Sequence, residues 1–400
     1  MGLKEANIVL DNQFNTYFPG QTVNGRVEYV FDSPKKVRGI HVKIKGEAHT
    51  SWSESRRQDT SDGKTEDVDE TISGHEEYFN INYYLLGSNS GNEIEIPAGR
   101  QVYNFTCTLP PVLPSSFEGQ FGYIRYTIKV TLDRPWKFDQ ETKIAFTVIN
   151  PLDLNLNPSY KAPLRLQMEK TFCCLCCASA PLSVDLQAPV TGYCPGQAIP
   201  IQLDVENKSN VQLHLIKVFL RKLVTYRATN TSASTSIKKT KDIVVTIQEG
   251  PVVAGGSKQF NLKLEVPPIP PSNLVNCSII DLDYDIKVEC AVSGMHFNLK
   301  DKKYVTIGTV PLVGGAPPSP SQPAVLHAGD AVGPGWVAPS APPYQSLYPS
   351  LTDPVYKEGN YSARTLQDKT DTNYTQIANA NNFAPFYPTY AAVLPPPLPQ

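Results

Sequence analysis

The chain has 400 residues, 40% of them hydrophobic, which is enough for two or three domains with ordinary cores. Its formal net charge of -2 excludes the strongly basic surface that would wrap a nucleic acid, and we expect no nucleic-acid partner. Charged residues make up only 18%, whereas 36 Pro and 20 Tyr exceed ordinary usage, so part of the chain is proline-rich and aromatic.

The N-terminal sequence MGLKEANIVL contains no apolar segment of signal-peptide length. We therefore expect a cytoplasmic protein whose eight Cys are reduced.

From Ile8 to Asn150 the sequence consists of short segments in which apolar and polar residues alternate, separated by Pro, Gly, Asn and Asp. This period of two, rich in Val, Ile, Tyr and Phe, is typical of strands that bury one face. The best examples are residues 25–31, 39–49, 101–109, 123–132 and 143–149. The insert from Ser53 to Ser73 is polar and mixed in charge, and we expect a long solvated hairpin loop there.

The next segment contains four cysteines, in Cys173-Cys174-Leu175-Cys176-Cys177. Three interpretations stay open: a zinc site, reversible S-palmitoylation, or a packed or merely exposed segment between two domains. Zinc needs four converging ligands, normally from two separate loops, and five consecutive positions hardly supply them. We therefore expect no metal and keep Cys173, Cys174, Cys176 and Cys177 as candidate palmitoylation sites.

Strand-like alternation returns between Leu182 and Val310, and three segments there repeat the first half in the same order. Residues 17–23 (YFPGQTV) match 193–199 (YCPGQAI), residues 109–115 (LPPVLPS) match 266–272 (VPPIPPS), and residues 126–130 (YTIKV) match 284–288 (YDIKV). Three matches in the same order at a roughly constant offset indicate that one fold is duplicated. The predicted fold class is all-β, with two tandem immunoglobulin-like β-sandwiches.

These patterns place the first sandwich at residues 1–152, a linker with the Cys cluster at 153–181, the second sandwich at 182–312 and a tail at 313–400. After Val310 the alternation stops, and Pro, Ala, Ser, Tyr, Asn and Gln dominate with few charges. Such a segment buries too little surface to offset the entropy lost on ordering, so we predict a disordered tail.

YFPGQTVNGRVEYVF near the start and GYCPGQAIPIQLDVEN at the opening of the second half resemble the arrestin fold. TFCCLCC, LVNCSIIDLDYDIKV and the closing VTIGTVPL are similar to the α-arrestins, the arrestin domain-containing and thioredoxin-interacting group. The resemblance implies a non-catalytic adaptor that docks on cytoplasmic regions of membrane proteins. It also implies links to ubiquitin ligases with WW domains and to endosomal sorting, in the cytoplasm and peripherally at the plasma membrane and endosomes.

Two features of the family are not found in the sequence. Members that recruit those ligases carry Pro-Pro-X-Tyr, whereas Pro342-Pro343-Tyr344 lacks the spacer residue and Asp353-Pro354-Val355-Tyr356 lacks the first proline. A WW groove places the tyrosine at a fixed distance beyond the two prolines, so the missing spacer misplaces the ring. We also find no sign of the buried charge cluster by which phosphate-sensing visual and β-arrestins are thought to switch.

The densest group of short motifs in the tail lies in residues 339–351. Pro339, Ser340, Ala341 and Pro342 have the P-[ST]-A-P form that docks in an extended conformation on ESCRT-I, where rigid prolines lower the ordering cost. Each motif of this length also arises by chance in a tail rich in Pro, Ala and Ser.

Tyrosine motifs follow directly. Tyr348, Pro349 and Leu351, preceded by Leu347, have the Y-P-X-L form bound by ALIX-type sorting adaptors. Tyr344 to Leu347, and again Tyr348 to Leu351, fit the tyrosine-based endocytic signal that a clathrin adaptor binds as an added strand.

A polyproline segment lies at the end of the chain. Pro396, Pro397, Leu398 and Pro399 are of the sort bound by SH3 domains or by WW domains of the Pro-Pro-Leu-Pro class. This segment would take the place of the absent Pro-Pro-X-Tyr, and all the tail motifs point to the same trafficking machinery.

The sequence shows neither a nucleophile motif nor a Gly-rich phosphate loop, so we expect no enzyme, no catalytic residue and no cofactor. Two other functions remain as alternatives to the trafficking adaptor. One is a redox or signalling regulator similar to thioredoxin-interacting protein, which would need an exposed Cys of low pKa. The other is a structural sorting-coat subunit that does not need the tail.

Overall fold

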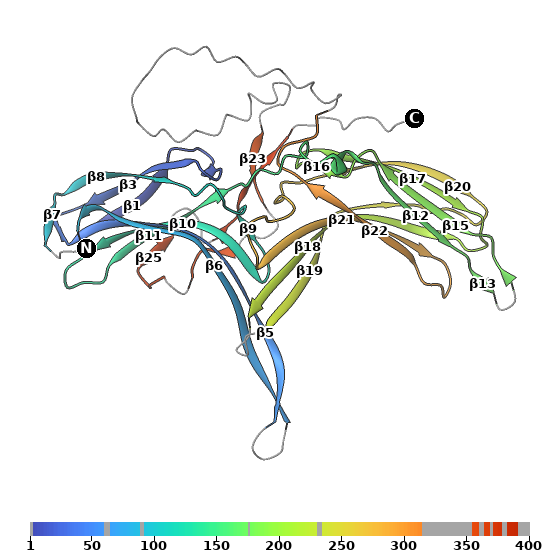
Figure 1. The fold of residues 1–400 in the computed structure, drawn as a ribbon, viewed down its shortest axis with the longest axis horizontal. Helices are drawn as coiled ribbons and strands as arrows, with labels where there is room; N and C mark the ends of the chain where they lie inside the picture. Colours follow the sequence, from blue (N-terminus) through green and yellow to red (C-terminus); the bar gives the residue numbers. More distant parts are fainter. Residues whose placement is uncertain are drawn as a thin grey trace, which may run out of the picture.

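The structure, a computed structural model, describes residues 3–59, 65–88, 92–174, 177–229, 234–313, 354–359, 364–368, 371–377 and 382–390. Its regular elements are β-strands and one short 3-10 helix, η1 (Pro158–Lys161). They confirm the predicted all-β class with two tandem sandwiches (Figure 1). Within the described ranges, no helix is long and apolar enough to cross a membrane.

In the first sandwich, a three-stranded sheet packs against part of a larger sheet. The three-stranded sheet has the order β1 (Leu3–Leu10), β3 (Thr22–Phe31), β8 (Gly99–Thr108). The facing strands are β5 (Gly39–Asp59), β6 (Thr65–Gly87), β10 (Gly122–Asp133) and β11 (Gln140–Val148), with β2 (Thr16–Tyr17) beside β11, β9 (Phe117–Glu118) beside β10, and β4 (Lys35–Val37) paired with β7 (Ile94–Ile96). Alternation buries Val27, Tyr29 and Ile128 between the layers, as the period of two predicts.

The second sandwich repeats this plan. Its smaller sheet has the order β12 (Leu164–Lys170), β15 (Leu182–Ala188), β17 (Ala198–Asn207), β20 (Ser257–Glu265). It faces β16 (Gly192–Tyr193), β22 (Leu299–Ile307), β21 (Ile280–Val292), β18 (Leu213–Thr229) and β19 (Thr235–Glu249). Strand β12 lies inside the expected linker 153–181 and pairs with β15, so the second sandwich uses an earlier part of the chain than the alternation alone suggests.

Equivalent hydrogen bonds in the two halves support the internal duplication. The hydroxyl of Tyr126 donates to the carbonyl of Pro114 at 2.7 Å, and that of Tyr284 donates to Pro270 at 2.8 Å. Both tyrosines are fully buried, so each carbonyl gains a partner that satisfies it inside the core.

One continuous sheet joins the sandwiches, because β6 of the first half pairs with β18 of the second. The contact is short: Ser73 lies opposite Thr229, and the Thr50 hydroxyl donates to the carbonyl of Arg227 at 2.7 Å. Gly74 permits this approach, since a Cβ there would lie 2.7 Å from the Thr50 Oγ1 atom.

The expected loop from Ser53 to Ser73 is instead mostly strand. β5 and β6 continue as a two-stranded ribbon that extends away from both sandwiches (Figure 1), with Ser53 opposite Thr71 and Asp59 opposite Thr65. The prediction of a hairpin is confirmed, but the prediction that these residues form a loop is wrong. A ribbon with solvent on both faces lacks the apolar alternation that indicates a half-buried strand.

Candidate functional site

Four stretches of the C-terminal tail have described structure, and they return to the folded body. Strand β23 (Val355–Glu358) pairs with β27 (Phe386–Thr389), and β24 (Arg364–Thr365) pairs with β26 (Asn382–Phe383). Strand β25 (Thr375–Ile377) adds in parallel to β11 at the edge of the first sandwich. These stretches bury Leu366, Tyr387 and Tyr390 and use the open backbone edge of β11.

A buried charge cluster fixes the tail to this edge. The Lys143 Nζ atom lies 2.5 Å from a carboxylate oxygen of Asp368 and 2.9 Å from one of Asp371. Lys129 completes the cluster, 3.3 Å from Glu141 and 3.7 Å from Asp371. The side chains of Lys143 and Asp371 are 4% and 0% exposed, so each charge depends on its partners rather than on water.

The sequence patterns do not predict this cluster. Lys143 and its acidic partners are separated by more than 200 positions in the chain, so no local pattern brings them together. A lysine in an edge strand also has an ordinary explanation, because such charges discourage strands from pairing with other chains. The sequence offers one signal for the cluster: Asp368 and Asp371 are acidic residues in a tail that has few charges.

Two tyrosines of the tail bridge the sandwiches. The Tyr387 hydroxyl donates to the carbonyl of Ser116 in the first half at 3.2 Å. The Tyr390 hydroxyl donates to the carbonyl of Thr309 in the second half at 2.6 Å, and its backbone N–H donates to the carbonyl of Pro195 at 2.9 Å. The tail thus contacts both domains at their junction.

The Pro-Gly turn of the second half contacts Tyr390 of the tail. A Cβ at Gly196 would lie 2.2 Å from the carbonyl oxygen of Tyr390, so only glycine admits this contact. At the equivalent Gly20 of the first half the nearest atom, in Pro111, would be 3.9 Å away. Among the described residues, the duplicated motif therefore contacts the tail in only one of its two copies.

The predicted partner-binding residues lie outside the described residues. This applies to Pro339, Ser340, Ala341, Pro342, Tyr344, Leu347, Tyr348, Pro349, Leu351, Pro396, Pro397, Leu398 and Pro399. Tyr356, the tyrosine of Asp353-Pro354-Val355-Tyr356, is described: its ring centroid lies 5.7 Å from that of Phe14, and burial raises the pKa of its hydroxyl to about 12. Tyr356 therefore packs against the first sandwich.

The candidate palmitoylation sites are only partly described. The backbones of Cys173, Cys174 and Cys177 form a short hairpin of β13 (Cys173–Cys174) and β14 (Cys177–Ala178), whereas Cys176 lies outside the described residues. No group of three His, Cys, Asp or Glu side chains that could hold a metal ion occurs in the part of the chain that the structure describes.

The cysteine side chains that the structure describes are poor candidates for thiol exchange. Cys194 and Cys290 are fully buried, and burial raises the pKa of the Cys290 thiol to about 12. Burial also raises the pKa values of Cys107, Cys194 and Cys277. A redox regulator needs the opposite, an accessible thiol of lowered pKa.

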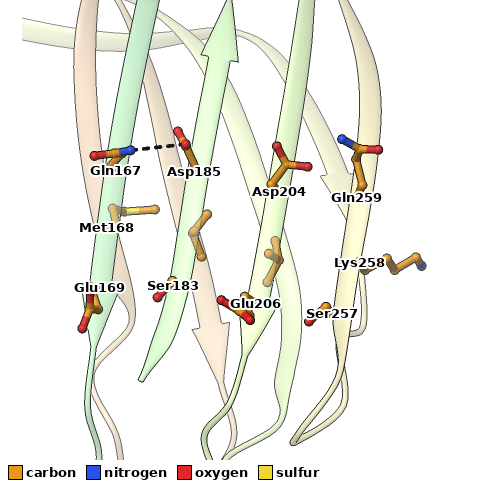
Figure 2. Close-up of a pocket in the computed structure, with 12 residues that line it drawn as sticks. Gln167, Met168, Glu169, Ser183, Asp185, Asp204, Glu206, Ser257, Lys258 and Gln259 are labelled. Carbon is orange, nitrogen blue, oxygen red and sulfur yellow. Dashed lines mark hydrogen bonds between the residues drawn. The ribbon is translucent and has the colours of Figure 1, made fainter. Parts of the chain in front are cut away.

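A second candidate surface lies on the smaller sheet of the second sandwich. A groove of about 770 Å³ runs over β12, β15, β17 and β20, lined mainly by polar side chains (Figure 2). Its chemistry is distinct from that of the tail site because carboxylates dominate it.

Comparison with known proteins agrees with this architecture. Residues 6–155 match the family model of the arrestin (or S-antigen) N-terminal domain, and residues 178–312 match that of the arrestin C-terminal domain. The chain is 27% identical to arrestin domain-containing protein 17 of Caenorhabditis elegans, over 97% of this chain and 99% of that protein. It is 28% identical to arrestin domain-containing protein 4 of Mus musculus, over 78% of this chain and 73% of the relative, and 28% identical to human arrestin domain-containing protein 1, over 85% and 73%.

Proposed function

Because the chain belongs to the arrestin family, in its arrestin domain-containing or α-arrestin group, we propose that this adaptor is non-catalytic and acts in membrane-protein trafficking. In this proposal the sandwiches bind the cytoplasmic region of a membrane protein at the plasma membrane or on endosomes. The tail recruits sorting proteins of the ESCRT-I and ALIX types, and WW- or SH3-domain proteins that include ubiquitin ligases.

The observation that carries the proposal is that the ligand-rich segment lies between two anchored points. On its N-terminal side, the Asn155 side chain accepts a hydrogen bond from the N–H of Val313 at 2.9 Å and donates to the carbonyl of Pro311 at 2.9 Å. On its C-terminal side, β23 begins at Val355 and pairs with β27. Residues 339–351, which contain all the tail motifs except the polyproline segment 396–399, fall between these anchors.

The position of Tyr356 favours sorting proteins over direct Pro-Pro-X-Tyr recognition as the first partners. Its packing against Phe14 partly buries the tyrosine of Asp353-Pro354-Val355-Tyr356, one of the two approximations to that motif. Recruitment of a ubiquitin ligase is then assigned to residues 396–399, which follow Tyr390, the last residue that the structure describes.

Purified partners give the most direct test. The full chain is compared with Pro339→Ala/Pro342→Ala for binding to the ubiquitin-binding-enzyme-like domain of ESCRT-I, and with Tyr348→Ala/Leu351→Ala for binding to an ALIX-type domain. Each double substitution should abolish binding to its own partner and leave the other partner bound.

A matched control is provided by prolines of the same tail. Pro317→Ala/Pro320→Ala removes two prolines outside the motifs and should change neither interaction. If every variant binds as the unmodified chain does, the adaptor role of the tail is refuted. Full activity in cargo sorting after deletion of residues 314–400 would favour the structural coat subunit.

A further inference from the structure

The groove on the second sandwich is built from two rows of side chains that cross four strands (Figure 2). Strand pairing places Gln167, Asp185, Asp204 and Gln259 in the first row and Glu169, Ser183, Glu206 and Ser257 in the second. Because side chains alternate along a strand, all eight share the outer face, while the intervening Val184 and Val205 are buried in the core.

The charged side chains of the two rows are all negative. Glu169, Asp185, Asp204 and Glu206 contribute four carboxylates. Lys258 also lines the groove, but it lies opposite Val205 and points away from the rows in Figure 2, with its Nζ atom 4.6 Å from the ring centroid of Phe260.

The nearby cations neutralise little of this charge. Lys208 lies 2.8 Å from Glu206, in a pair whose side chains are about half exposed, and Arg165 belongs to the next row along β12. An exposed pair of this kind contributes little because water and salt screen it.

The centre of the groove holds a like-charge pair. Asp185 and Asp204 stand directly opposite each other on neighbouring antiparallel strands, an arrangement that destabilises a sheet. Amides orient them: Gln167 and Gln187 donate to the same oxygen of Asp185, at 3.3 and 3.1 Å, and Gln202 donates to Asp204 at 2.9 Å. The other oxygen of Asp185 is buried and has no hydrogen-bond partner among the described residues, which leaves an acceptor without a donor.

We propose that this groove binds an extended Lys- or Arg-rich segment from the cytoplasmic region of a membrane protein, next to its membrane span. The sign of the charge fits, because cytoplasmic segments close to spans are enriched in Lys and Arg. The spacing fits as well: the rows are two residues apart along each strand, which is also the spacing of alternate side chains in an extended peptide, about 6.6 Å. This inference rests on the proposed adaptor function and specifies the chemistry of its cargo.

The test uses the full chain and a fluorescent synthetic peptide that alternates Lys and Ser, with a peptide that alternates Glu and Ser as the probe control. Fluorescence anisotropy should show binding of the basic peptide only, weakened as ionic strength rises. Asp185→Asn/Asp204→Asn should weaken it by about tenfold or more, since two carboxylates facing the bound cations are lost.

A matched variant separates local recognition from net charge. Asp281→Asn/Asp283→Asn removes the same charge from β21, outside the groove, and should change the affinity less than about twofold. Equal weakening by both variants, or no binding by the unmodified chain, would overturn the inference. A third outcome would also overturn it: the unmodified chain forms a dimer and binds no peptide, and only the groove variant is monomeric. The groove would then hold a second copy of the chain.

The outcome is independent of the tail. Binding of ESCRT-I and ALIX-type domains to residues 339–351 requires no groove carboxylate. If the basic peptide does not bind the groove, the proposed adaptor role of the tail therefore still stands. Conversely, a tail that binds no sorting protein does not affect the peptide measurement.

Discussion

Replacing Lys143 by Ala should release the tail from the first sandwich. The substitution removes the cation that lies 2.5 Å from Asp368 and 2.9 Å from Asp371, and the nearest remaining cation at the cluster is Lys129, 3.7 Å from Asp371. Removing one partner of a buried ion pair costs about 3–5 kcal/mol, because the other charge stays buried without compensation. The penalty falls only on the docked state, because a released tail carries its carboxylates into water. The lower end of that range, about 3 kcal/mol, corresponds to a rise of about 100-fold in the ratio of released to docked tail.

Limited trypsin digestion measures this release. The tail has three trypsin sites, after Lys357, Arg364 and Lys369. Cleavage after Arg364 gives the clearest measure, because its guanidinium donates to the carbonyl of Gly119 at 2.8 Å while the tail is docked. When opening is fast relative to cleavage, the cleavage rate follows the open population, so Lys143→Ala should be cut about 100-fold faster than the unmodified chain.

Two further variants complete the trypsin experiment. Lys143→Arg keeps the charge and should restore most of the protection. Lys36→Ala breaks an exposed pair with Glu93, 3.5 Å apart, and should leave the rate nearly unchanged. Equal cleavage of Lys143→Ala and the unmodified chain would refute the conclusion that the cluster holds the tail.

Two other substitutions test separate parts of the structure. Gly196→Ala and Gly20→Ala both place a side chain at positive φ, +88° and +82°, and each should lower the unfolding free energy by about 1–2 kcal/mol. Only Gly196→Ala should also increase hydrogen exchange in residues 386–390, because only its Cβ meets the tail; equal exchange in both variants would contradict this. Burial, which outweighs the attraction of Asp133, lowers the pKa of His41 below its usual 6.5, so the unfolded chain takes up a proton first as the pH falls. The stability that neutral His41 provides above pH 6.5 should therefore be lost as the pH falls below 6.5. The unfolding free energy, measured with urea, should decrease less between neutral and acidic pH in His41→Gln than in the unmodified chain. Equal decreases in the two proteins would exclude this role.

The sandwiches could be predicted because their information is local. Alternation within residues 123–132 and 143–149 identifies strands that bury one face, and the repeated Tyr in YTIKV and YDIKV identifies the duplication. The structure then shows that Tyr126 and Tyr284 each donate a hydrogen bond to a proline carbonyl in the matched segments 109–115 and 266–272.

The tail site could not be predicted because its information is distributed along the chain. Nothing beside Lys143 indicates that Asp368 and Asp371 are its partners, and the tail is too polar overall to suggest packing. Composition averages over the tail and conceals the few aromatic residues, such as Tyr387 and Tyr390, that anchor it. The groove was equally hidden, since its carboxylates come from three strands that appear in sequence as ordinary polar faces of half-buried strands.

The ribbon formed by β5 and β6 has a mechanical consequence. The same two strands belong to the first sandwich, pass the junction at Thr50 and Ser73, and continue outward as the ribbon, with no turn between. Residues 51–59 extend about 30 Å beyond Thr50, so a rotation of about 10° at the junction displaces the far end by about 5 Å. Small changes in the angle between the domains are therefore magnified into a displacement that a partner, or a pair of spectroscopic probes on the ribbon and the second sandwich, can detect.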